Sequence, residues 1–385
     1  MKDRLELFKS NSFYTGLVLF TFFVFMQLTT WIPLRLWNIW GGGNFIDSQQ
    51  IIEWSNCYKI EGNAIFQSYG DCPGYIYGST LVRILSLLNM TPSSAQIFGY
   101  VFMFLLALTV SYHAGGLEKY QENPFVLTIV LSPPILLLAE RANFDILMLV
   151  LVALAVLLFN KNYHSWALLP LALATLVKFY TLPLFLVFFF LNDNYRRKTI
   201  TLIAGAMVSA RVYLDLELMQ GSFPSGAGAK FGVSIWTRYI DEATVSDLGE
   251  WYANLSGAAI FAIVCVITLI VFRRLHIAII TEAIGDKKRR MYFYIFFGTH
   301  LSCYFLGMSY DYRLVFLAIA SIIYLYWFVS KGCLLQKVVL VMTMLSLWLT
   351  YPSSGLAPVG DLATEILTII LGIRYLQLLK LDLKM

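Results

Sequence analysis

The sequence predicts an all-α polytopic membrane protein, a bundle of about twelve transmembrane helices with a long first outer loop. Hydrophobic residues make up 59% of the chain and charged residues only 13%, whereas soluble domains average about 25% charged residues. Apolar stretches also recur along the chain, several of them at the roughly 17–25 residues that a spanning helix needs. We therefore expect residues 1–385 to form a single integral membrane domain.

The predicted spans begin with a retained N-terminal anchor. Three basic residues precede the apolar run 13–32, which lacks a small-residue cleavage site, so this run is interpreted as a span and not as a signal peptide. An outer segment at about 35–90 follows. Its apolar piece 75–88 carries Arg83, which is typical of a helix that lies along the membrane interface. The next predicted spans are 93–112, 124–139, 144–159, 165–177, 182–191 and 199–214, and the second of these is expected to bend at Pro133–Pro134.

The basic loops set the predicted orientation of the C-terminal half. A second outer segment, at about 215–253, is followed by five more predicted spans. Basic blocks at 196–198 and 273–290 fall on the same side of the membrane as the N-terminus. Because Lys and Arg concentrate in cytoplasmic loops, we expect both termini inside and both long polar segments outside. The five spans are 254–272, 291–308, 314–329, 337–351 and 362–379.

One stretch, 140–183, gathers the polar side chains that indicate chemistry. It opens with a polar cluster that includes Arg141, Asn143 and Asp145, and Lys178 follows two apolar runs later. Two spans return the chain to the same side, so the cluster and Lys178 are expected on one outer surface. Asp145 is expected to pair with Arg141. A cation near the bilayer centre costs about 2.5–3.5 kcal/mol on insertion scales, so Lys178 either serves a function or extends to the interface.

This arrangement resembles the GT-C type of membrane glycosyltransferases that use polyprenyl-phosphate sugars, and in particular glycosyltransferase family 87 with its bacterial mannosyltransferases. The matching residues are Arg141-Ala142-Asn143, the apolar runs that follow, and Lys178-Phe179-Tyr180. The proline that follows the lysine in that family comes later here, at Pro183. Outside this stretch the resemblance is one of layout.

The resemblance implies transfer of a monosaccharide, mannose by analogy, from a polyprenyl-phosphate donor to a hydroxyl of a cell-envelope glycolipid or glycan, with inversion. In that family an aspartate at the start of the first outer loop is the catalytic base. The matching residue here is Asp47, with Glu53 and Asp71 in reserve. The alternative for Asp47 is the N-cap of a helix that begins at Ser48.

The donor phosphate leaves as an anion, so cations are needed to stabilise it. Arg141, Lys178 and Arg313 are predicted to hold this phosphate, although Arg313 has an alternative role in an ion pair with Asp311. The predicted supporting residues are Asn143, Asp145, Tyr180, Tyr310, Asp311 and Tyr312.

The motifs that the sequence lacks limit which donor and which binding partners are expected. The sequence contains no P-loop motif and no soluble stretch of the size of a nucleotide-binding domain, so the donor is expected to reside in the membrane already. We predict no cofactor and no nucleic-acid partner, with a divalent metal left open. The expected partners are the lipid-linked donor, the acceptor and membrane lipids, in a bacterial inner membrane, with the site on the outer face.

Two alternatives to this function remain. One is a polymerase or ligase of lipid-linked oligosaccharides, and the other is a transporter or flippase. A transporter more often shows an internal repeat of broken helices, and this sequence shows no such repeat.

Cys57 and Cys72 both lie in the first outer segment, where the compartment permits a disulfide between them.

Overall fold

The structure is a computed structural model that describes residues 11–29, 45–67, 77–91, 93–114, 124–218, 230–231, 287–305, 309–310, 313–327, 334–350 and 356–384. These residues form 14 α-helices, two short 3₁₀ helices and one pair of two-residue strands. The prediction of an all-α fold is confirmed. The chain groups into two compact units, one of residues 1–122 with 136–227 and one of residues 123–135 with 228–385. The single domain predicted for 1–385 stays a prediction.

The first unit begins with two long apolar helices, α2 (Asn11–Thr29) and α6 (Ser94–Ala114), which pack along each other. The approach is close at Gly16, where a Cβ atom would lie 2.7 Å from Leu108 Cδ2. A larger residue at position 16 would therefore push the two helices apart. These helices match the predicted runs 13–32 and 93–112.

The outer segment of this unit contains two helices that pack together, α4 (Ile46–Glu61) and α5 (Ser79–Leu87), with a 3₁₀ helix, η1 (Gly62–Gln67), between them. One face of α5 is buried and the other is exposed, as expected of the amphipathic helix predicted at 75–88. Its buried apolar residues are Leu81, Val82 and Leu85, and its exposed ones are Ile84, Leu87 and, just beyond the helix, Leu88. Its location at the membrane interface stays a prediction.

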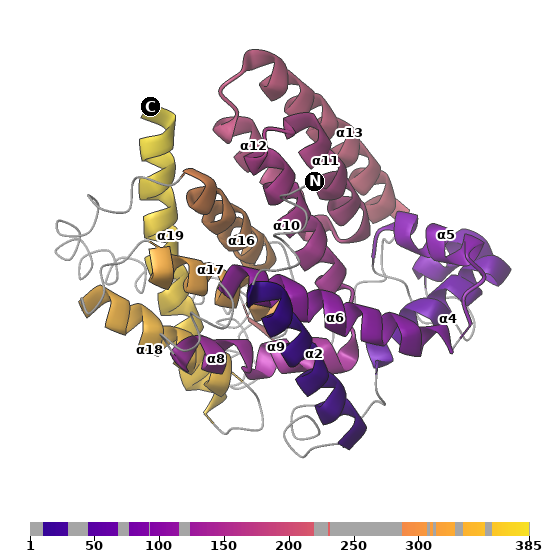
Figure 1. The fold of residues 1–385 in the computed structure, drawn as a ribbon. Helices are drawn as coiled ribbons and strands as arrows, with labels where there is room; N and C mark the ends of the chain where they lie inside the picture. Colours follow the sequence, from indigo (N-terminus) through magenta and orange to yellow (C-terminus); the bar gives the residue numbers. More distant parts are fainter. Residues whose placement is uncertain are drawn as a thin grey trace, which may run out of the picture. The chain divides into compact units, whose positions relative to one another are not determined.

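Four helices of the first unit run side by side and alternate in direction (Figure 1). They are α10 (Asp145–Asn160), α11 (His164–Val177), α12 (Leu184–Leu191) and α13 (Tyr195–Leu218). Short connections join them, so the α10–α11 and α12–α13 turns lie at one end of this bundle. The rings of Phe159 and Phe188, both near that end, meet edge to face at 5.1 Å. The start of α10 and the α11–α12 connection lie at the opposite end.

The chain bends by 109° between α9 (Pro133–Arg141) and α10. Ala142 adopts a left-handed backbone conformation at this bend, with φ of 46°, which is uncommon for a residue that carries a Cβ atom. The run 124–139 was predicted as one span with a bend at Pro133–Pro134. The structure divides it there into two helices, α8 (Pro124–Val130) and α9, so a continuous span is wrong while the position of the bend is confirmed. Proline is favoured in the first turn of a helix, and Pro133 and Pro134 begin α9.

The second unit packs four helices in chain order, α16 (Lys287–Phe305), α17 (Leu314–Trp327), α18 (Leu334–Leu349) and α19 (Ala357–Lys384). Aromatic rings fill the contact between α16 and α19, where Tyr294 of α16 meets Tyr375 of α19 edge to face at 5.4 Å. Arg290 holds both carboxylate oxygens of Asp382, at 3.0 and 2.7 Å. The strands β1 (Lys230–Phe231) and β2 (Ser309–Tyr310) pair antiparallel in the same unit.

The predicted count of twelve spans is too high for the part of the chain that the structure describes. Four helices there are long and apolar enough to cross a membrane, and a fifth is gained if α9 and α10 count as one bent span. The others are shorter or too charged; α12, for example, is about 12 Å long against a hydrocarbon core of about 30 Å. The predicted span 254–272 lies outside the described residues. The four are Ser12–Thr29, Ser94–His113, Tyr195–Leu218 and Ala357–Lys380.

Candidate functional site

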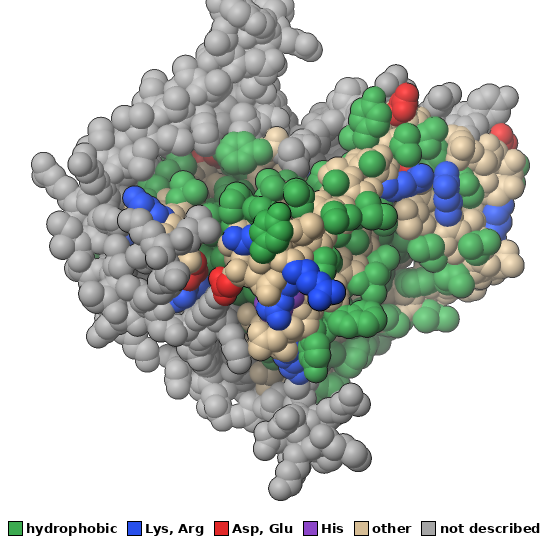
Figure 2. Space-filling model, turned by 90° about the horizontal axis from the view of Figure 1, so that it is seen from above, with side chains coloured by type: hydrophobic (Ala, Val, Ile, Leu, Met, Phe, Trp, Pro, Cys, Tyr) green, Lys and Arg blue, Asp and Glu red, His purple; other side chains and the backbone are tan. Residues whose placement is uncertain are grey.

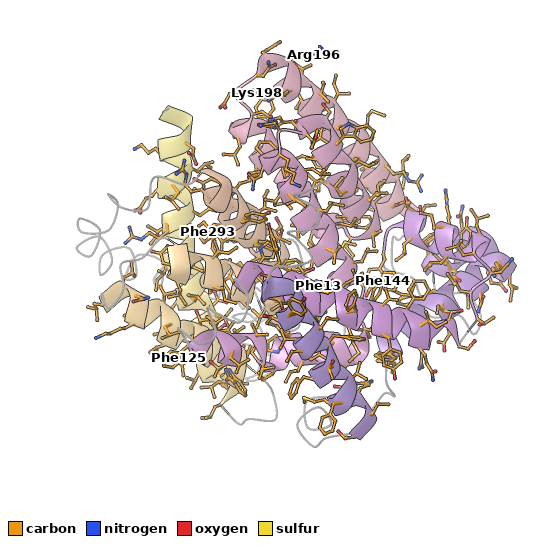
Figure 3. All side chains as sticks on the ribbon, viewed as in Figure 1. Phe13, Phe125, Phe144, Arg196, Lys198 and Phe293 are labelled. Carbon is orange, nitrogen blue, oxygen red and sulfur yellow. The ribbon has the colours of Figure 1, made fainter. Side chains whose placement is uncertain are left out.

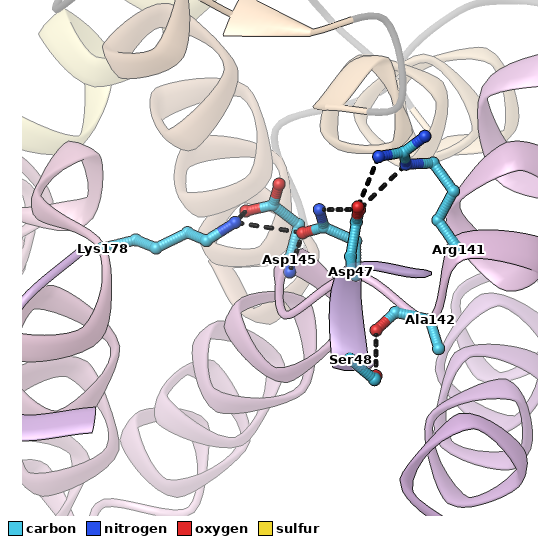
Figure 4. A network of polar contacts seen from close by, with 7 residues as sticks. Asp47, Ser48, Arg141, Ala142, Asp145 and Lys178 are labelled. Carbon is cyan, nitrogen blue, oxygen red and sulfur yellow. Dashed lines mark hydrogen bonds and ion pairs between the residues drawn. The ribbon is translucent and has the colours of Figure 1, made fainter. Parts of the chain in front are cut away.

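Asp47 lies in the first turn of α4, and Arg141 at the end of α9 holds its carboxylate with two donors (Figure 4). Arg141 Nη2 donates to Oδ1 at 2.5 Å and Nε donates to Oδ2 at 3.0 Å. Asn143 Nδ2 donates to Oδ2 at 2.5 Å. Bidentate, charge-assisted hydrogen bonds of this kind are strong, and they also hold the two side chains in a defined orientation. The alternative role of Asp47 as an N-cap is wrong, because the N-cap of α4 is Phe45.

Residues on both sides of Asp47 also hold the start of α4 against the α9–α10 bend. The backbone N–H of Phe45 donates to the carbonyl of Glu140 at 3.0 Å. Ser48 Oγ donates to the carbonyl of Ala142 at 2.7 Å. The ring of Phe45 is buried and meets that of Tyr100 on α6 at 5.2 Å. The carboxylate of Asp47 is therefore positioned by backbone contacts on both sides of it.

Lys178, immediately after α11, is buried beside a second carboxylate. Its Nζ lies 2.8 Å from Asp145 Oδ1, and its side chain is only 2% exposed. The same Nζ lies 4.6 Å from the centre of the Tyr77 ring, in a cation–π contact. Tyr180 OH donates to Asp145 Oδ1 at 2.5 Å. The alternative in which Lys178 extends to the interface is therefore wrong.

Asn143 joins the two ion pairs. Its Nδ2 donates to Asp47, while its Oδ1 accepts from Lys178 Nζ at 3.0 Å and from the backbone N–H of Asp145 at 2.8 Å. The last bond is a local turn of the Asx type and begins α10. Two carboxylates and two cations thus share one buried network in which their formal charges balance.

The structure brings together six of the predicted site residues, but it pairs them differently from the expectation. Arg141 holds Asp47, and the ion-pair partner of Asp145 is Lys178. The reserve candidate Glu53 is exposed on α4. The six residues are Asp47, Arg141, Asn143, Asp145, Lys178 and Tyr180.

The remaining predicted residues stay predictions. Tyr310 and Arg313 belong to the second unit, and Asp71, Asp311 and Tyr312 lie outside the described residues. Cys57 is disulfide-bonded. Because Cys72 lies outside the described residues, the pairing of these two cysteines stays a prediction. Within the described ranges, no group of three His, Cys, Asp or Glu side chains is placed to hold a metal ion.

Sequence reasoning missed the segment Tyr77-Gly78-Ser79, in which each residue makes a different contact. The Tyr77 ring lies over Lys178 and meets Trp54 of α4 at 5.6 Å. Gly78 donates its N–H to the carbonyl of Val177 at 3.0 Å. A Cβ atom at position 78 would collide with the backbone of Leu176. The segment therefore closes one side of the lysine site.

Asp215, near the end of α13, holds this segment and was also missed. It is fully buried, and it accepts from the backbone N–H of Ser79 at 3.1 Å and from Ser79 Oγ at 2.7 Å. Arg211 Nη2 donates to the same carboxylate at 2.7 Å. The signal in the sequence was an Arg and an Asp four residues apart at the end of an apolar helix, the spacing of a helical ion pair.

Asp215→Ala is expected to destabilise the protein by about 1–3 kcal/mol, because it leaves buried donors of Ser79 unsatisfied. The thermal unfolding midpoint of the purified protein in detergent measures this loss. Glu217→Ala is the matched control, since Glu217 is an exposed acid on the same turn of α13. An unfolding midpoint for Asp215→Ala equal to that of the control would contradict the structural role of Asp215.

The network offers a carboxylate with remaining acceptor capacity next to two cations. A carboxylate has about four acceptor positions, and the donors to Asp47 in the described part of the chain are Arg141 Nε, Arg141 Nη2 and Asn143 Nδ2. One further hydroxyl can therefore donate to it.

Comparison with protein-family models, with curated proteins and with solved structures finds no match.

Proposed function

We propose that this protein is a membrane glycosyltransferase that moves a monosaccharide from a polyprenyl-phosphate donor to a hydroxyl of a glycolipid or glycan acceptor. The observation that carries the proposal is the buried network in which Asp47 contacts Arg141 and, through Asn143, reaches Lys178. A general base and cations for an anionic leaving group are what this reaction needs. Mannose as the sugar rests on the resemblance to glycosyltransferase family 87.

The proposed step is a single displacement. The acceptor oxygen attacks the anomeric carbon, its proton passes to Asp47, and the bond from that carbon to the phosphate oxygen breaks. The bonding electrons leave with the phosphate, whose negative charge Arg141 and Lys178 stabilise. Attack from the side opposite to the leaving group inverts the anomeric configuration. Because both cations already pair with carboxylates, the phosphate would join these pairs, with Arg313 as a predicted third cation.

The distribution of charge along the first unit supports a site on the outer face. Asp145 and Lys178 lie at one end of the four-helix bundle, and the exposed basic residues 196–197 lie at the other. Because basic residues favour the cytoplasmic side, the network would face outward. The bacterial inner membrane as the location rests on the resemblance to glycosyltransferase family 87.

Cysteine labelling of intact cells tests this orientation. In Lys59→Cys the new thiol lies on the exposed surface of α4, and in Ser165→Cys it lies at the exposed start of α11. We expect a membrane-impermeant thiol reagent to label the first variant in intact cells and the second only after permeabilisation. Labelling of Ser165→Cys alone in intact cells would place the network on the cytoplasmic face.

The reaction itself is tested with membranes that contain or lack the protein, each incubated with a panel of radiolabelled polyprenyl-phosphate sugars. We expect one donor to label a lipid or glycan fraction only when the protein is present. The anomeric configuration of the new linkage then reports inversion. If no donor in the panel yields a labelled product, the transferase proposal fails.

One observation favours a second candidate, a transporter or flippase. Transporters often use helices broken at mid-membrane with charged groups at the break, and the 109° bend between α9 and α10 carries Asn143 and Asp145. A reconstituted transporter would move a labelled lipid-linked sugar across a liposome membrane without forming a new covalent product. Product analysis of the same liposomes therefore separates the two functions.

A further inference from the structure

The end of the four-helix bundle that lies opposite to Asp145 and Lys178 carries an excess of positive charge. It consists of the α10–α11 and α12–α13 turns with the first residues of α11 and α13, and we call it the basic end. Its basic residues are Lys161, Arg196, Arg197 and Lys198, and its single acidic residue is Asp193. The first three are exposed, while Lys198 Nζ lies 5.8 Å from the centre of the Phe189 ring. Arg196 and Lys198 are labelled at this end in Figure 3.

Three aromatic side chains stand exposed around the same end. Tyr163, Trp166 and Tyr195 are 56%, 67% and 85% exposed. In a soluble domain such exposure of large rings is unusual, but Trp and Tyr are enriched where a membrane protein passes from hydrocarbon to headgroups. In the view of Figure 2, basic side chains lie next to hydrophobic ones.

The sides of the bundle between its ends are apolar and exposed. On α13 the stretch from Tyr195 to Arg211 spans about 24 Å along the helix axis, close to the roughly 30 Å of a hydrocarbon core. A bundle embedded over that length brings the basic end to the depth of the phospholipid headgroups. The exposed apolar residues on its sides are Leu154, Leu169, Leu173, Leu186, Phe190, Leu202, Ile203 and Met207.

We propose that the basic end binds the headgroups of anionic phospholipids. Cations next to an anionic leaflet are attracted to it within a Debye length, and here three exposed cations lie beside three exposed interfacial rings. A soluble protein or a nucleic acid fits this surface less well, because the rings and apolar sides that adjoin the charges would remain in contact with water.

The test uses the purified full-length protein in an uncharged detergent, with a short-chain phosphatidylglycerol or a phosphatidylcholine of the same chain length added. The midpoint of thermal unfolding, followed by tryptophan fluorescence, reports binding because a ligand of the folded state raises it. We expect phosphatidylglycerol to raise the midpoint more than phosphatidylcholine does. Arg196→Gln/Arg197→Gln should weaken the apparent affinity for phosphatidylglycerol by about thirtyfold.

The control is Lys59→Gln, which removes an exposed positive charge from α4 and should keep the wild-type response. A second pair, Lys161→Gln/Arg196→Gln, repeats the test at the basic end if the first variant fails to fold. Equal shifts with the two lipids, or a wild-type response in the basic-end variants, would overturn the proposal. The proposal would also be overturned if an oligonucleotide raised the unfolding midpoint as much as phosphatidylglycerol does and the basic-end variants reduced that effect equally. The readout needs no transferase activity, so its outcome is independent of the proposed reaction.

Discussion

Asp47→Asn is expected to lower sugar transfer by about 10²–10⁴-fold, the usual contribution of a general base, measured as turnover at saturating donor. Asparagine keeps the size of the side chain and still accepts a bond from Arg141, but it cannot take the proton of the acceptor hydroxyl. The loss should therefore appear in turnover, with donor binding largely retained. Near-normal turnover would remove Asp47 from the base role.

The pairing of Asp47 with Arg141 makes a second variant necessary. If Asp47 only neutralised Arg141, its loss would reduce activity by disturbing the network. The double variant Asp47→Asn/Arg141→Gln removes both charges of the pair, so it should regain thermal stability relative to the single variant. Arg141 is itself proposed to hold the phosphate, so Arg141→Gln alone is the reference for transfer. A structural role of Asp47 predicts that the double variant transfers sugar as fast as Arg141→Gln does. A catalytic role predicts that its transfer stays far below that of Arg141→Gln.

Two other acids on α4 complete this experiment. Glu61→Gln is a control at the far end of the helix and is expected to transfer sugar at the wild-type rate. Glu53→Gln tests the reserve candidate, whose exposed side chain makes no contact with the network among those described. Turnover lost in Glu53→Gln and kept in Asp47→Asn would move the base to Glu53.

The sequence predicted where helices form better than how many of them span the membrane. Apolar runs give α2, α6, α13 and α19 close to their predicted positions, because a long apolar run in lipid can satisfy its backbone hydrogen bonds only within a helix or a closed barrel. The run 124–139 breaks into two helices, because a proline pair begins a new helix at Pro133. The predicted number of spans was too large chiefly because several apolar runs form helices too short to cross a membrane, such as α11 and α12.

Six of the predicted site residues lie together, but the contacts among them were not predicted. Arg141 and Asn143 are local to one motif, and the resemblance implied Asp47, but the contact between Asp47 and Arg141 joins residues 94 positions apart. Such a contact follows from the packing of α4 against the α9–α10 bend, which no periodicity in the sequence encodes. The same holds for Asp215 and Ser79, which are 136 positions apart.

Lys178→Met is expected to destabilise the protein by about 3–5 kcal/mol, because it leaves the buried carboxylate of Asp145 without its cation. Both side chains are at most 2% exposed, so water cannot take the place of the lost partner. Titration with a denaturing detergent measures the stability of the variant against the wild type. Lys161→Met, at an exposed lysine just before α11, is the matched control and should change stability by no more than about 0.5 kcal/mol.

The double variant Lys178→Met/Asp145→Asn separates stability from donor use. It removes both charges, and the new amide at position 145 still accepts from Tyr180. Because the effects of two substitutions in one ion pair are not additive, most of the stability lost in Lys178→Met should return. Transfer at limiting donor should nevertheless remain low, because the cation proposed to hold the phosphate is absent. A double variant that regains both stability and transfer would show that Lys178 serves only to neutralise Asp145. If Lys178→Met alone were as stable as the wild type, the ion pair itself would not contribute to the fold.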